Sequence, residues 1–155
     1  DRTALWKALN DDRIDVLATD HAPHTLAEKS NPYTSAPSGG PLVQHALLAL
    51  LTAVGQGKIG IEKLVQKACH NPAILFQVKN RGYIKEGFQA DLVLVDLEKK
   101  TTVNKDNLLY QCGWSPFEGT TFDASIEKTW VNGQLVYNQG EIIEAGAGEQ
   151  LTFSR

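Results

Sequence analysis

The stretch Ile14-Asp15-Val16-Leu17-Ala18-Thr19-Asp20-His21-Ala22-Pro23-His24 decides the fold of this chain. Its first six residues are almost continuously apolar, which is typical of a strand buried on both faces in a parallel sheet covered by helices. Polar residues follow from Asp20 onward. About twenty residues without a regular pattern continue to Gly40, and loops of that length inside a compact domain are usually functional. The pattern therefore predicts an α/β protein with a functional loop at the carboxyl end of a strand.

Helical patterns surround this stretch. Apolar side chains at helical spacing predict a short helix before it and a longer one that Pro41 opens, since the missing N–H of proline costs nothing at a helix start. Two further helices follow before the chain turns to β-type sequence. The predicted helices are Thr3–Asn10, Pro41 to about Val54, Ile61–His70 and Asn71 to about Val78.

The composition changes most sharply near residue 80. Beyond it, glycines separate short β-prone stretches, of which Asp91–Asp96 is a predicted strand. Asn132-Gly133, between Trp130-Val131 and Gln134–Tyr137, predicts a hairpin with a type I′ turn, because that turn needs two residues at positive φ. We therefore expect two domains: residues 1–80, the end of a helix-covered parallel sheet, and residues 81–155, part of a small β-sandwich.

Composition excludes several classes of protein. The 155 residues carry a net charge of −3, so there is no basic excess to neutralise the phosphates of a nucleic acid. The longest apolar run, Ala46–Val54, is far too short to span a bilayer. Two distant cysteines, Cys69 and Cys112, cannot form a disulfide framework, so we expect a reducing, cytoplasmic location.

The start of the sequence bears on every functional claim. The chain contains no methionine and begins Asp-Arg-Thr at the edge of the first predicted helix. We therefore expect these residues to be part of a longer protein whose N-terminal portion is missing.

The strongest chemical signal is the group Asp20, His21 and His24. A carboxylate and two imidazoles fall within five residues, directly after the predicted strand. These are ligands that zinc accepts, and a carboxylate can also take and pass on a proton. The same residue types often act as turn and capping groups, so spacing alone leaves both interpretations open.

A second candidate is Ala36-Pro37-Ser38-Gly39-Gly40-Pro41, which leads into the longer predicted helix. Free backbone N–H groups at a helix start attract anions, including carboxylates. An ordinary loop before a proline-capped helix would have the same sequence. His45 and His70 have no carboxylate at ligand spacing, and we interpret them as structural or surface residues.

Three of these stretches carry a resemblance to a known family. Ala18–His24, Ala36–Gly39 and Gly82–Asp96 resemble the C-terminal third of the dihydroorotases of the amidohydrolase superfamily. The first is the more specific, because related hydantoinases and allantoinases usually carry other residues where His24 stands. The resemblance implies an α/β fold: the last strand and helices of a metal-dependent (β/α)₈ barrel, followed by part of a small β-sandwich.

The resemblance also implies roles for four residues. Asp20 matches an aspartate that binds one zinc of a two-zinc centre and moves a proton to the leaving nitrogen. His24 matches the histidine that contacts the substrate carboxylate. Ser38 and Gly39 match a pair that holds substrate, and since many members carry Phe where Ser38 stands, a backbone contact is what carries over. His21 matches a position that is not a metal ligand.

The activity implied is the reversible hydrolysis of (S)-dihydroorotate to N-carbamoyl-L-aspartate in pyrimidine biosynthesis. The remaining zinc ligands have no counterpart in this chain, so we expect it to be inactive without the missing N-terminal barrel portion. The expected partners are a small-molecule substrate and that portion, with no nucleic acid and no membrane; a homodimer is left open. Two alternatives remain: a related cyclic amidase acting on hydantoins or allantoin, and a dihydroorotase-like scaffold that has lost its metal.

Overall fold

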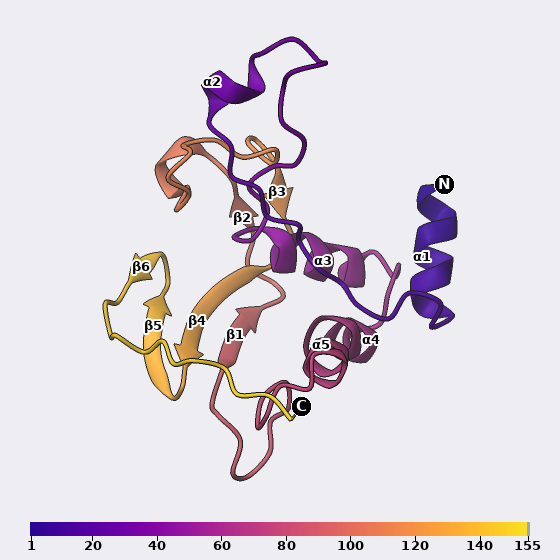
Figure 1. Ribbon diagram of the computed structural model, residues 1–155, viewed down its shortest axis with the longest axis vertical. Helices are drawn as coiled ribbons and strands as arrows, with labels where there is room; N and C mark the ends of the chain where they lie inside the picture. Colours follow the sequence, from indigo (N-terminus) through magenta and orange to yellow (C-terminus); the bar gives the residue numbers. More distant parts are fainter. Residues whose placement is uncertain (155) are drawn as a thin grey trace. The chain divides into compact units, whose positions relative to one another are not determined.

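The computed structural model describes residues 1–154, which form a mixed α/β structure (Figure 1). The residues gather into two compact units that do not follow the sequence in two blocks. The first unit contains residues 1–17, 53–96 and those from 126 onward, and the second contains residues 18–52 and 97–125. The boundary near residue 80 stays a prediction.

The first unit combines short helices with an open sheet. Helix α1 (Arg2–Asn10) confirms the predicted N-terminal helix. Helix α4 (Ile61–Val65) continues into the π-helix η1 (Gln66–His70) and then into α5 (Asn71–Leu75), as predicted for this region. Leu9, Ile59 and Leu64 are the large apolar side chains that this part of the unit buries.

The sheet of the first unit has the strand order β1-β4-β5-β6. These strands are β1 (Leu92–Asp96), β4 (Ser125–Val131, whose first residue belongs to the second unit), β5 (Gln134–Asn138) and β6 (Glu141–Ile142). Asn132 and Gly133 join β4 to β5 with φ values of 50° and 80°, which confirms the predicted type I′ turn. Arg81 and Asp91 hold this turn: Arg81 Nη2 donates to Asn132 Oδ1 at 2.6 Å, and Asn132 N donates to Asp91 Oδ1 at 2.8 Å.

The second unit is mostly loop, arranged around one helix. Its elements are α2 (Leu26–Lys29), most of α3 (Ala46–Gly55), the paired strands β2 (Thr101–Thr102) and β3 (Thr121–Phe122), and the 3₁₀-helix η2 (Lys105–Asn107). Its buried residues come from the segment before α3, from α3 itself and from the 97–125 segment, and include Pro41, His45, Leu48, Leu51, Val103, Phe122 and Ala124.

Two sequence predictions in this region are wrong in detail. Residues 14–19 are not in a strand, because none of the described strands runs beside them; Leu17 N instead donates to Lys67 O of η1 at 3.0 Å. The longer helix begins at Ala46 rather than at Pro41. Pro41 is buried, and residues 43–45 form a turn first. None of the helices in residues 1–154 has the length and apolar character needed to cross a membrane.

Asp12 links the turn after α1 to the α4–η1 helical segment. Its carboxylate accepts hydrogen bonds from Lys63 Nζ at 2.8 and 2.9 Å, and Lys67 Nζ lies 2.8 Å from Oδ1. The Lys67 side chain is only 1% exposed, so Asp12 supplies the counter-charge for a buried ammonium group. The hydrogen bonds from the two lysines lower the pKa of Asp12 to about 2.

This geometry predicts how stability depends on pH. The Asp12 pKa falls from 3.8 to about 2 on folding, so its contribution is complete above pH 4 and is lost as the pH falls toward 2. We expect Asp12→Asn to lower the melting temperature of the complete protein at pH 7 and to match the wild type increasingly as the pH drops through that window. Asp15→Asn, which removes a charge nearby, is the control. A difference between wild type and Asp12→Asn that stays constant from pH 7 to 2 would contradict the assignment.

Candidate functional site

Asp20 lies at the start of the long loop of the second unit. The residue is exposed, and its φ of 45° places it in the left-handed region. Aspartate tolerates this region better than most residues, and such conformations cluster at functional sites. The backbone conformation of Asp20 therefore marks the point where the long loop begins.

The backbone joins the two candidate stretches directly. His21 and Gly40 form a parallel bridge, in which Ala22 N donates to Gly40 O at 3.0 Å. Gly39 has a φ of 87°, and a Cβ built on it would lie 2.7 Å from Ala22 Cβ. Glycine is thus required at this position both for its conformation and for the close approach of the two loops. The structure places His24 and the Ser38–Gly39 turn on neighbouring segments of one unit.

His21 is a capping group. Its Nδ1 accepts hydrogen bonds from Leu42 N at 3.0 Å and Val43 N at 3.3 Å, and the next amide, Gln44 N, donates to Tyr110 Oη at 2.9 Å. These bonds occupy the N–H groups ahead of α3 that an anion would have used. An anion at this helix start would therefore find the N–H groups of Leu42, Val43 and Gln44 already bonded, which favours the ordinary-loop interpretation of this part of the segment.

His24 is held through its main chain. Its N donates to Ala22 O at 2.9 Å across Pro23, and its carbonyl oxygen accepts from Trp114 Nε1 at 2.8 Å. The side chain is 36% exposed, with Nδ1 4.0 Å from Glu28 Oε2. The imidazole is therefore accessible while the backbone that carries it is fixed.

The residues after His24 form a capping box at α2. Thr25 Oγ1 accepts from Glu28 N at 3.3 Å, and Thr25 N donates to Glu28 Oε2 at 2.7 Å. Hydrogen bonds from the Thr25 side chain and backbone also lower the pKa of Glu28. The box keeps a carboxylate beside the His24 imidazole.

Lys29 supports the second loop from the end of α2. Its Nζ donates to Pro37 O at 2.6 Å and Gly39 O at 3.0 Å, which are the carbonyls on either side of Ser38. This places an ammonium group at the turn that we expect to face substrate. Lys29 and Trp114 were not among the predicted site residues, because neither has a motif spacing and their partners are main-chain oxygens.

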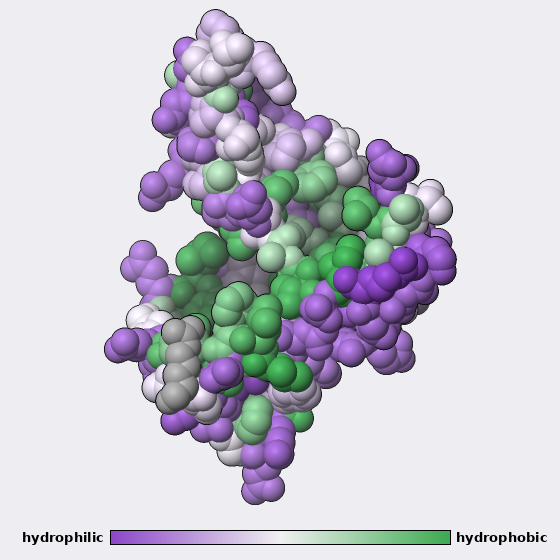
Figure 2. Space-filling view, turned by 45° about the vertical axis from the view of Figure 1, so that its right-hand side comes forward, coloured by the Kyte–Doolittle hydropathy of each residue, from purple (hydrophilic) through white to green (hydrophobic). Residues whose placement is uncertain are grey.

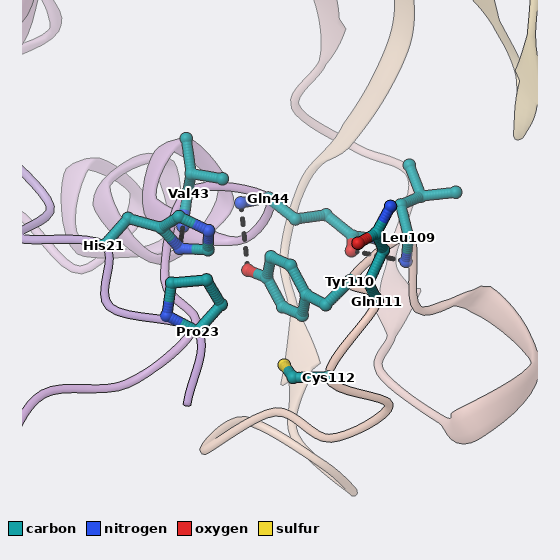
Figure 3. A pocket seen from close by; sticks show the side chains of 8 residues that line it. All are labelled: His21, Pro23, Val43, Gln44, Leu109, Tyr110, Gln111 and Cys112. Carbon is teal, nitrogen blue, oxygen red and sulfur yellow. Dashed lines mark hydrogen bonds between the residues drawn. The ribbon is translucent and has the colours of Figure 1, made fainter. Parts of the chain in front are cut away.

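A cavity of about 540 Å³ lies beside these loops within the same unit (Figure 3). His21 and Pro23 line it from the first loop, Val43 and Gln44 from the start of the α3 region, and residues 109–112 from the later segment. Its polar groups are largely engaged: Gln44 Nε2 donates to Asn107 O at 2.7 Å, and Gln44 Oε1 accepts from Leu109 N at 2.9 Å. Hydrogen bonds of the Gln44 side chain thus fix this wall of the cavity to residues 107–109.

His45 contacts Tyr110, one of the residues that line the cavity. It is 2% exposed, and its Nδ1 is 3.3 Å from Ser115 Oγ and 3.4 Å from Tyr110 Oη. Burial lowers the pKa of His45 and raises that of Tyr110. The structural interpretation of His45 is confirmed, and His70 stacks on Tyr83 with ring centroids 4.1 Å apart.

The described residues do not make a complete metal site. Among residues 1–154, no group of three His, Cys, Asp or Glu side chains is placed to hold a metal ion. Asp20 can offer one carboxylate, and His21 Nδ1 is already occupied by backbone N–H groups. Both cysteines are free, and Cys69 is exposed rather than buried as thiols of this kind usually are.

Comparison with known proteins gives the family. Residues 1–136 match the family described as "Amidohydrolase family". The chain belongs to the amidohydrolase family. Two curated members are similar over 97% of this chain: the dihydroorotase of Pyrococcus furiosus, 37% identical, and that of Halobacterium salinarum, 42% identical. The chain spans about a third (35%) of the length of these relatives.

Solved structures of amidohydrolases share the fold. A D-hydantoinase (dihydropyrimidinase) from Thermus sp. is 28% identical with a TM-score of 0.86, covering 92% of this chain and 32% of its own. An L-hydantoinase (dihydropyrimidinase) from Arthrobacter aurescens is 31% identical with a TM-score of 0.86, covering 96% and 34%.

The contact between the two loops can be tested at Gly39. We expect Gly39→Ala to reduce the free energy of unfolding of the complete protein by about 2–4 kcal/mol, because the new Cβ meets Ala22 and the backbone is strained. Gly113→Ala is the matched control, with a φ of 68° and nothing within 4 Å, and should cost only about 1 kcal/mol. Urea unfolding measures both. Equal losses of unfolding free energy in the two variants would show that the close approach of residue 39 to Ala22 does not contribute to stability.

Proposed function

We propose that this chain forms the C-terminal part of a dihydroorotase, which reversibly hydrolyses (S)-dihydroorotate to N-carbamoyl-L-aspartate in pyrimidine biosynthesis. One observation carries the proposal: the loop with His24 and the turn Ser38–Gly39 are bonded together in a chain whose curated relatives include dihydroorotases at 37% and 42% identity. These loops are where the resemblance places the contacts to the substrate carboxylate.

Asp20 is the proposed acid–base residue. An exposed carboxylate at a sharp backbone turn can accept a proton and return it to the ring nitrogen that leaves when the cyclic amide opens. The same carboxylate is the one zinc ligand that we assign to this chain.

His24 and the Ser38–Gly39 turn are the proposed carboxylate-binding groups. An imidazole N–H and backbone N–H groups can donate charge-assisted hydrogen bonds to a carboxylate. Lys29 lies against the carbonyls of the same turn, so it adds positive charge there that favours an anionic substrate.

The zinc centre must draw on further polypeptide. A pair of zinc ions supplies a hydroxide nucleophile at neutral pH in enzymes of this type, and one carboxylate cannot hold two ions. We therefore propose that the other ligands lie outside these 155 residues, in an N-terminal barrel portion, and that the residues described here are inactive without it.

Exposed apolar side chains support a contact with further polypeptide. On the face drawn in Figure 2, apolar residues reach the surface among hydrophilic ones. Strand β1, at the edge of its sheet, exposes Leu92, Val93 and Leu94 by 36–50%, so side chains on both of its faces meet solvent. Apolar surface of this kind is usually covered by a partner. A homodimer and a cytoplasmic location stay predictions.

A hydantoinase-like activity is the second candidate. The solved structures that share the fold include D- and L-hydantoinases at TM-scores of 0.86. The two activities cleave the same kind of cyclic amide bond and differ in the ring substituent that the enzyme binds. The residues that bind this substituent therefore decide between them.

Substrate assays on the complete protein test the proposal. We expect hydrolysis of dihydroorotate, with little turnover of hydantoin or allantoin. His24→Ala should raise KM for dihydroorotate by about 10-fold or more, because a hydrogen bond to a charged group is lost, while His70→Ala should leave KM unchanged. Preferential hydrolysis of hydantoin would favour the second candidate, whereas a His24→Ala variant with wild-type KM for dihydroorotate would overturn the role proposed for His24.

Asp20 is tested by Asp20→Asn. The amide cannot accept the proton, so kcat should fall by about 10²- to 10⁴-fold, while Asp106→Asn, another exposed acid of the same unit, retains activity. Elemental analysis should find about two zinc ions per wild-type chain. A wild-type protein that is active without zinc, or an Asp20→Asn variant with full kcat, would overturn the assigned role.

A further inference from the structure

The indole of Trp114 touches both loops that carry the proposed substrate contacts. Its Nε1 donates to the carbonyl oxygen of His24 at 2.8 Å. Its Cη2 lies against Gly40, where a Cβ would be 3.6 Å away, in ordinary van der Waals contact. One side chain thus uses its polar edge on the first loop and its apolar edge on the second.

The bond to His24 completes the fixation of that residue. On the N-terminal side, His24 N donates to Ala22 O at 2.9 Å in a three-residue turn over Pro23. On the C-terminal side, the capping box at Thr25 fixes the start of α2. The carbonyl oxygen between them accepts the Trp114 N–H, so losing that donor frees the backbone at the point that sets the direction of the imidazole.

The residue that follows Trp114 is buried and contacts the region around α3. The next residue, Ser115, is 6% exposed; its Oγ accepts from Phe117 N at 3.2 Å and lies 3.3 Å from Nδ1 of the buried His45. His45 also packs edge-on against Phe117, with ring centroids 6.0 Å apart. The segment that carries the indole is therefore anchored to the helix α3 region rather than to the loops it contacts.

We propose that Trp114 is a positioning residue: it holds His24 and the Gly39–Gly40 turn at the separation needed to bind the substrate carboxylate. The proposal rests on the proposed function. Tryptophan suits the position because its ring supplies the packing and its single N–H supplies the bond. Phenylalanine keeps most of the packing and removes the donor, so it isolates the bond to His24.

The test is steady-state kinetics on the complete protein with dihydroorotate. Trp114→Phe should raise KM by about 3- to 10-fold, as expected for one hydrogen bond, and change kcat less than 2-fold. In a His24→Ala background the same substitution should change KM less than 2-fold, because Trp114 acts through His24. Trp130→Phe, in β4 of the other unit, is the matched control and should leave both constants unchanged.

Three results would overturn the positioning role of Trp114. These are an unchanged KM in Trp114→Phe, a fall in its kcat alone, or an equal rise in KM when Trp114→Phe is made in the wild type and in the His24→Ala variant. Wild-type protein that does not hydrolyse dihydroorotate would instead overturn the proposed function, and the positioning role with it. If Trp114→Phe does not fold, the indole ¹⁵N–H resonance of Trp114 in the wild-type protein, assigned by through-bond correlation to the backbone of residue 114, gives the answer. The Trp114 resonance should shift on saturation with N-carbamoyl-L-aspartate, and a resonance that does not move would overturn the role.

Discussion

The pairing of residues 21–22 with Gly40 is the constraint on which the candidate site depends. A single backbone bond, from Ala22 N to Gly40 O, joins two loops that are otherwise irregular. It is possible only because residue 39 has no Cβ, since a side chain there would collide with Ala22. The separation proposed for His24 and the Ser38–Gly39 turn therefore depends on this contact, together with the side-chain bonds around it.

Around this contact, side chains supply the hydrogen bonds to main-chain atoms that regular secondary structure supplies elsewhere. His21 caps the turn before α3, Lys29 binds the carbonyls on either side of Ser38, and Trp114 binds the carbonyl of His24. Each of these groups satisfies main-chain atoms that a helix or sheet would otherwise have paired. The loops thus hold a definite shape without regular hydrogen bonding, and the Asp20 carboxylate stays exposed and the His24 imidazole partly exposed.

The sequence predicted those features that depend on local chemistry. The Asn132–Gly133 turn was predictable because two positive φ angles are encoded by two adjacent residues, and α1 because its apolar spacing is local. Residues 14–19 were predicted as a strand, yet a strand needs a neighbour, and none of the strands in residues 1–154 pairs with them. Lys29 and Trp114 could not have been found from sequence, because their partners are backbone oxygens 8 to 90 residues away.

The proposal assigns proton transfer and substituent binding to different residues, and this separation affects which substrate is chosen. Opening a cyclic amide makes the same demand for a proton whatever substituent the ring carries, so the acid–base role proposed for Asp20 would not distinguish dihydroorotate from a hydantoin. Discrimination must arise where the substituent is bound, and a site built for a carboxylate rejects a ring without one because its donors are left unpaired. The donors proposed here belong to His24 and the Ser38–Gly39 turn, with Lys29 alongside. On the assignment proposed here, substrate specificity would depend on how firmly the two loops are held together, and the bonds from Lys29 and Trp114 contribute to that.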